Sequence, residues 1–135
     1  MDYTIFHAMI LHFPIVLFWL GFIFDLLGLV FKFKVYPAGH WIIIGAALIA
    51  VPTALAGLEA SQSFPGNPFI IIHRNWALAT VTYGLMHGAF RFYALIKKKQ
   101  VAPLIWTLLS IINVGLISMT AEYGGWVAFG KSLFK

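Results

Sequence analysis

Long apolar stretches alternate with short polar segments along the whole chain. A transmembrane helix needs about 20 mostly apolar residues, and four stretches reach that length, over residues 4–31, 40–60, 70–96 and 103–123. The pattern therefore predicts an all-α integral membrane protein. Residues 1–135 should form one domain, a bundle of four transmembrane helices.

The segments between the predicted spans contain residues that end helices or stay in water. Lysines, Pro37 and Gly39 follow the first span, a segment rich in Ser, Pro and Gly follows the second, and three lysines follow the third. Because these connections are short, successive helices should be antiparallel neighbours in an up-down-up-down four-helix bundle. The first and third helices then face each other. The last span should end at Tyr123, and the tail over residues 124–135 should lie at the membrane surface.

The composition supports lipid as the main solvent of this chain. It is 61% hydrophobic and only 10% charged, whereas soluble domains carry about 25% charged residues. There is no cysteine, which excludes disulfides, thiolate metal sites and cysteine nucleophiles. No basic stretch alternates with exposed aromatic residues, so we expect no nucleic-acid partner. The expected partners are the lipid bilayer and other membrane protein subunits.

The basic residues predict the orientation in the membrane. One side of the predicted bundle carries Lys32, Lys34, Arg91, Lys97, Lys98 and Lys99, and the other carries Arg74, Lys131 and Lys135. By the positive-inside rule, the first group is cytoplasmic. Both termini then face the periplasmic or outer side of the cell inner membrane. The N-terminus lacks the basic region of a signal peptide, so the first apolar stretch should be an uncleaved span.

Two opposite charges lie at similar depth in the first and third spans. Asp25 is one to two turns from the inner end of its span, and Arg91 is at a similar distance from the inner end of its own. Charges within a membrane are costly and usually find a partner. We therefore predict an Asp25–Arg91 ion pair that fixes the register of the two helices. The alternative is a proton or ion relay.

The predicted ion pair sets the register of two histidines further along the same helices. His7 precedes Asp25 by 18 residues, and His73 precedes Arg91 by 18 residues, which is about five whole turns. His7 should therefore face His73 at equal depth near the outer surface. Two imidazoles on facing helices can be the axial ligands of a b-type haem, whose ring needs an apolar slot. The simpler interpretation is that both histidines lie at helix ends in the wet interface.

His12 suggests a second kind of site. It lies about 140° round the helix from the first histidine, so it should point towards the second or fourth helix, which end near Glu59 and Glu122. Histidine and carboxylates can bind a transition-metal ion, and the alternative is a hydrogen-bonded His–Glu pair close to water. Pro14 can kink the first helix, which would make His12 an alternative haem ligand.

Several motifs at these positions resemble a known family. They are His7 followed by His12-Phe13-Pro14, Asp25 late in the first span, Gly57-Leu58-Glu59 closing the second, His73 with Asn75 opening the third, and Gly124-Gly125 before Phe129. In these features the chain resembles the predicted bacterial membrane proteins called domain of unknown function 2231. Glu59 stands where aspartate is more usual, and Ala8 replaces the usual proline.

The resemblance implies a four-helix membrane protein and draws attention to His7, His12, Glu59 and His73. Some relatives look fused to or associated with redox domains such as Rieske-type iron–sulfur modules, which favours the haem interpretation by analogy. The resemblance covers nearly the whole chain but implies no particular activity.

Three functions are consistent with the sequence. The first is a b-type haem electron-transfer protein or a subunit of a membrane redox complex. The second is a cofactor-free accessory subunit of a larger membrane complex. The third is transition-metal binding or transport through His12, Glu59 and Glu122. No nucleophile–base arrangement or nucleotide-binding glycine motif is present, so we expect no catalytic activity of its own.

Overall fold

The computed structural model describes residues 3–31 and 36–130, and within these ranges all regular structure is helical. The elements are α1 (Tyr3–Ile10), α2 (His12–Phe31), α3 (Tyr36–Ala60), the short 3-10 helix η1 (Ser61–Ser63), α4 (Ile70–Ile96) and α5 (Pro103–Phe129). This confirms the predicted all-α class. Lys32, Lys34, Lys131 and Lys135, which contribute to the predicted orientation, lie outside the described residues.

Three apolar segments of the described chain are long enough to cross a membrane. They cover residues 3–31, 38–63 and 103–129. α4 has the length but not the same apolar character, because it carries Arg74 and Arg91 as well as two histidines. The membrane crossing of α4 therefore remains a prediction.

The first apolar segment is interrupted near its start. α1 ends at Ile10 and α2 begins at His12, while the Leu11 amide still donates to the His7 carbonyl at 3.0 Å. Pro14 explains the break, because it has no N–H to donate to the carbonyl of Ile10 and its ring crowds that carbonyl. The predicted kink thus separates a short α1 from the longer α2.

The last helix extends further than the sequence predicted. It continues through Gly124 and Gly125 to Phe129, and Gly130 closes it in the left-handed conformation with φ 70°. Both internal glycines lie at positions with little space for a side chain. Gly125 is buried, and a Cβ on Gly124 would lie 3.2 Å from Cε1 of His73. The missing side chains allow close packing and do not end the helix.

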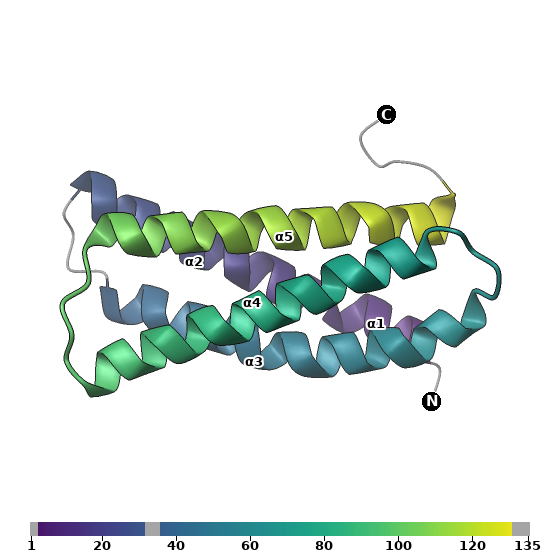
Figure 1. The fold of residues 1–135 in the computed structure, drawn as a ribbon, viewed down its shortest axis with the longest axis horizontal. Coiled ribbons are helices and arrows are strands. Elements are labelled where there is room, and N and C mark those ends of the chain that lie inside the picture. Colours follow the sequence, from purple (N-terminus) through teal and green to yellow (C-terminus); the bar gives the residue numbers. More distant parts are fainter. Residues whose placement is uncertain (1–2, 32–35, 131–135) are drawn as a thin grey trace.

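The helices lie side by side along one long axis (Figure 1). The start of α1, the η1 turn and the last turn of α5 lie together at one end, which we call the η1 end. The connection between α4 and α5 lies at the opposite end. α2 packs against α3 and α5, and α4 also packs against α3 and α5.

The buried apolar core lies between the two ends of the bundle. It consists of Phe18, Ile43, Ala46, Ala50 and Ile117. The alanines let α3 approach its neighbours closely, as small residues do in membrane helices. This apolar layer separates two groups of buried polar residues, one towards each end.

Candidate functional site

A cavity of about 520 Å³ lies at the η1 end of the bundle. Its size falls within the usual range of about 300–1,000 Å³ for small-molecule sites. Residues from all five α-helices line it, and many of them are small: Ala50, Ala54, Gly57, Ala77, Ala121 and Gly124. Small residues leave space between helices that larger side chains would fill. We call this cavity the pocket.

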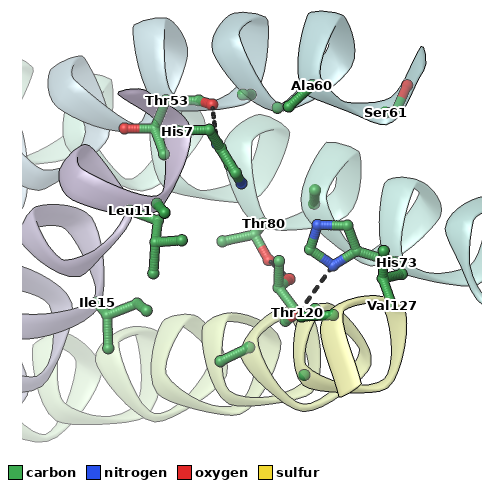
Figure 2. Close-up of a pocket in the computed structure, with 18 of the residues that line it drawn as sticks. His7, Leu11, Ile15, Thr53, Ala60, Ser61, His73, Thr80, Thr120 and Val127 are labelled. Carbon is green, nitrogen blue, oxygen red and sulfur yellow. Dashed lines mark hydrogen bonds between the residues drawn. The ribbon is translucent and has the colours of Figure 1, made fainter. Parts of the chain in front are cut away.

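His7 and His73 lie on opposite walls of the pocket, as the 18-residue spacing predicts. His7 of α1 donates from Nδ1 to the carbonyl oxygen of Thr53 on α3 at 3.0 Å. His73 of α4 donates from Nδ1 to the carbonyl oxygen of Thr120 on α5, also at 3.0 Å. A carbonyl only accepts, so Nδ1 of each ring carries a hydrogen. Nε2 of each ring points into the pocket (Figure 2).

The hydroxyl groups of the lining threonines are already used within the protein. Thr53 donates to the Ile49 carbonyl at 2.8 Å, and Thr120 donates to the Leu116 carbonyl at 2.9 Å. The hydroxyls of Thr80 and Thr120 also pair with each other at 2.8 Å. The two Nε2 atoms are therefore the main polar groups that these walls present to a ligand.

Two glycines place backbone directly against the histidine rings. A Cβ on Gly57 would lie 2.8 Å from Cε1 of His7, and a Cβ on Gly124 would lie 3.2 Å from Cε1 of His73. Real Cβ atoms essentially never come as close as the first of these distances. Each imidazole is thus held between a carbonyl acceptor and a glycine face, which restricts the plane of the ring.

The two walls repeat one another in the sequence, which the sequence analysis missed. His73 follows His7 by 66 residues, while Thr120 follows Thr53 by 67 and Gly124 follows Gly57 by 67. The detectable signal is a histidine followed after 46 or 47 residues by threonine, with glycine four residues later. Because only these sparse positions match, an ordinary search for a strong repeat passes over them. The two histidine-bearing walls of the pocket therefore come from corresponding helix pairs, α1 with α3 and α4 with α5.

His12 lines the same pocket but points differently from the other two histidines. Its side chain is exposed, and its Nδ1 donates to the Ala8 carbonyl one turn earlier at 3.1 Å. Glu59 accepts from Gln62 at 3.0 Å, and Glu122 accepts from the Trp126 indole at 2.8 Å. These side chains bond within or next to their own helices, so they do not converge.

Metal binding by His12, Glu59 and Glu122 stays a prediction, because their hydrogen bonds do not test it. Within residues 3–31 and 36–130, no group of three or more His, Asp or Glu side chains is placed to hold one metal ion. Local hydrogen bonds to residues three or four positions away explain the outcome.

The second group of buried polar residues lies on the side of the apolar core away from η1 and contains Asp25 and Arg91. Arg91 Nη1 donates to Asp25 Oδ1 at 3.1 Å, and Arg91 Nη2 is paired with Asp25 Oδ2. Ser110 donates to Asp25 Oδ2 at 2.6 Å. Arg91 is 1% exposed and Asp25 is 7% exposed. The structure thus joins the two charged residues that the sequence analysis paired.

This inner network also includes His87 of α4, and Trp106, Ser110 and Asn113 of α5, a helix that the sequence did not link to the ion pair. The guanidinium carbon of Arg91 lies 4.7 Å from the centre of the Trp106 ring, and Arg91 Nε donates to His87 Nε2 at 2.9 Å. The side-chain amide of Asn113 lies 2.6 Å from His87 Nδ1. Ser110 and Asn113 are three residues apart in α5, and that spacing on one helix face is the signal that would have found them.

The bond from Arg91 settles the proton position in His87. Because His87 Nε2 accepts that bond, the proton of the neutral ring is on Nδ1. Nδ1–H needs an acceptor, but the Asn113 atom that faces it at 2.6 Å is the donor Nδ2. The amide oxygen and nitrogen of Asn113 must therefore be exchanged, so that the oxygen accepts from Nδ1–H. This assignment also gives a partner to the buried Asn113 oxygen, which otherwise has none. The Arg91 side chain directs its donors at His87, Asp25 and Ser110 inside the protein.

Long apolar helices, internal charges and an apolar exterior define a helical membrane protein. Large hydrophobic side chains such as Phe13, Leu55 and Ile111 are exposed along the outside of the bundle, where lipid can cover them. The chain belongs to the family of predicted membrane proteins called domain of unknown function 2231, which it matches over residues 4–133. This confirms the resemblance seen in the sequence. No curated protein and no solved structure matches the chain.

Proposed function

We propose that this membrane protein binds a b-type haem between His7 and His73 and transfers electrons as part of a membrane redox complex. One observation carries the proposal: two histidines from facing helices direct Nε2 into a single, mostly apolar pocket. Bis-histidine ligation in a helical bundle requires this arrangement of side chains.

The surroundings of the two rings fit such a role. A ligating histidine usually donates its other ring N–H to a carbonyl or carboxylate, which fixes its tautomer and orientation. Thr53 and Thr120 supply those carbonyls, and glycines flank both rings. Haem supplies one-electron redox chemistry when it is bound. The protein's own part is to hold the two nitrogens in place and to surround the ring with apolar walls.

A difference-spectrum experiment tests the proposal. The protein is expressed with ample haem supply, purified, and its visible spectrum recorded before and after dithionite. We expect sharp reduced α and Soret bands, and His7→Ala and His73→Ala should each abolish them. A protein without colour and without another bound metal would contradict the proposal and favour the accessory-subunit function.

His12→Ala is the matched control, because His12 lines the same pocket but its Nδ1 donates to the Ala8 carbonyl one turn earlier in the chain. We expect it to keep the low-spin spectrum. If His12→Ala abolished the bands while His7→Ala kept them, His12 would be the ligand that pairs with His73.

We further propose that α4 also crosses the membrane, giving an up-down-up-down bundle with both termini on the outer side of the inner membrane. Support comes from α4 itself, whose polar Thr80, His87 and Arg91 are buried inside the bundle. Lys97–Lys99 follow α4 at the end away from η1, which favours a cytoplasmic location for that end.

Reporter fusions test this orientation. A fusion at Lys98 should report the cytoplasm, and one at Lys135 should report the outer side. A fusion at Gln62, in η1, should agree with the one at Lys135. A cytoplasmic signal from Lys135 would contradict the proposed topology.

A further inference from the structure

The wall of the pocket between α1 and α5 differs from its other walls. α5 packs closely against α2 and α4, and α1 packs closely against α3, but α1 and α5 do not form a close pair. In Figure 1, α1 lies beside α3 and apart from α5. The break at Leu11 separates α1 from α2, so α1 does not follow α2 along α5.

Residues on both sides of this separation line the pocket and are also exposed. On the first segment they are Ala8 and His12, and on α5 they are Ala128 and Phe129. A side chain that is both lining and exposed marks a place where the cavity reaches the surface. The pocket therefore has an opening on the side of the bundle, between α1 and α5.

The surroundings of this opening are apolar. Met9 and Phe13, next to the two lining residues of the first segment, are 68% and 57% exposed. His12 follows His7 by five residues, or about 7.5 Å along the helix, so the opening extends into the apolar span. Exposed apolar side chains at this position favour contact with lipid hydrocarbon.

We propose that this opening faces the lipid bilayer and that the molecule bound by His7 and His73 is a lipid-soluble planar compound that enters sideways between α1 and α5. The role of the two histidines rests on the proposed function, whereas the opening rests on the packing of α1 and α5. An apolar ligand is favoured because the hydroxyls of Thr53, Thr80 and Thr120 are bonded to carbonyls of their own helices. A strongly hydrated ligand would find too few partners in such a pocket.

The first test measures access to the pocket and does not depend on haem. Since the chain has no cysteine, a single nitroxide label can be placed at Ala77→Cys, which lines the pocket. The neighbouring Leu78→Cys is the matched control, because Leu78 is 56% exposed on the outside of the same helix. In vesicles, relaxation of each label is measured with oxygen, which enters lipid, and with a water-soluble nickel complex.

We expect both labels to be relaxed strongly by oxygen and weakly by the nickel complex. Strong relaxation of the Ala77→Cys label by the nickel complex would show that the pocket opens to water, and would overturn the proposal. Protection of that label from both reagents would show a closed cavity, and would overturn it as well.

The second test measures entry of haem from phospholipid vesicles that contain it. Ala8→Trp places a large ring at the opening, and Met9→Trp places the same ring on an adjacent residue that does not line the pocket. We expect Ala8→Trp to slow the appearance of the Soret band about tenfold relative to Met9→Trp. Equal rates would overturn the sideways route. If neither variant nor the unmodified protein takes up haem, the proposed function fails, and the label experiment alone decides the opening.

Discussion

The two ends of the bundle bury similar polar residues in opposite ways. At the η1 end, His7 and His73 each use one ring nitrogen in a hydrogen bond and direct the other into a cavity. At the opposite end, Arg91 directs its donors at Asp25, His87 and Ser110 inside a packed interior. The pocket at the η1 end therefore has ring nitrogens available to a ligand, whereas the residues of the network around Arg91 are packed together and buried.

This difference separates binding from stability. A buried charge that is fully paired contributes little net stability, but removing one partner leaves the other unpaired in an apolar surrounding. Removing His7 or His73 leaves behind only an uncharged backbone carbonyl and no buried charge. Changes at the inner network should therefore affect folding most, and changes at the pocket should affect ligand binding most.

The largest stability effect is expected at the ion pair. Asp25→Asn and Arg91→Met should each lower the free energy of unfolding in detergent by about 3–5 kcal/mol, because each leaves its partner buried without a countercharge. The double variant should lose less than the sum of the two single variants. Strictly additive losses, measured by thermal or denaturant unfolding, would show that the two residues do not interact.

The pocket histidines should have a smaller effect on the ligand-free protein. His7→Ala and His73→Ala each remove one hydrogen bond to a threonine carbonyl, for which about 1 kcal/mol is expected. The same variants should lose all ligand binding in the spectrum. A loss of stability as large as that of Arg91→Met would contradict the distinction between the two ends.

The smallest effects are expected at the glycines beside the rings. Gly57→Ala should displace the His7 ring and alter the spectrum or its electron paramagnetic resonance more than Gly124→Ala, because its new Cβ would lie closer to Cε1, at 2.8 Å against 3.2 Å. Gly115→Ala is the matched control, since nothing lies within 4 Å of its new Cβ. That control should leave the spectrum unchanged and gain up to about 1 kcal/mol from helix propensity.

Equal spectral changes in all three glycine variants would contradict the idea that the close contacts hold the rings. A change confined to Gly57→Ala and Gly124→Ala would sharpen the comparison between the two walls. It would show that the repeat of His, Thr and Gly in the two helix pairs acts as one binding unit.

The sequence by itself determined the helical segments and the register of two of them. Apolar length and polar breaks placed the third helix over residues 70–96, and α4 has the same bounds. Asp25 and Arg91 were paired from depth alone, and the 18-residue spacings carried that register to His7 and His73. The pairing of Asp25 with Arg91 succeeded because helix rise and period are fixed by backbone geometry. The count from Asp25 to His7, by contrast, crosses the break between α1 and α2.

Tertiary structure decided which partners the side chains find. α5 continues through Gly124, which lies close to the His73 ring, whereas the sequence alone predicted an end at Tyr123. The carbonyls of Thr53 and Thr120, like the Asn113 amide beside His87, become partners only when neighbouring helices take their final rotation and spacing. Backbone carbonyls carry no sequence signature. Small differences in helix rotation decide whether a side chain meets a neighbouring helix or bonds to a residue one turn away in the chain, as His12 does.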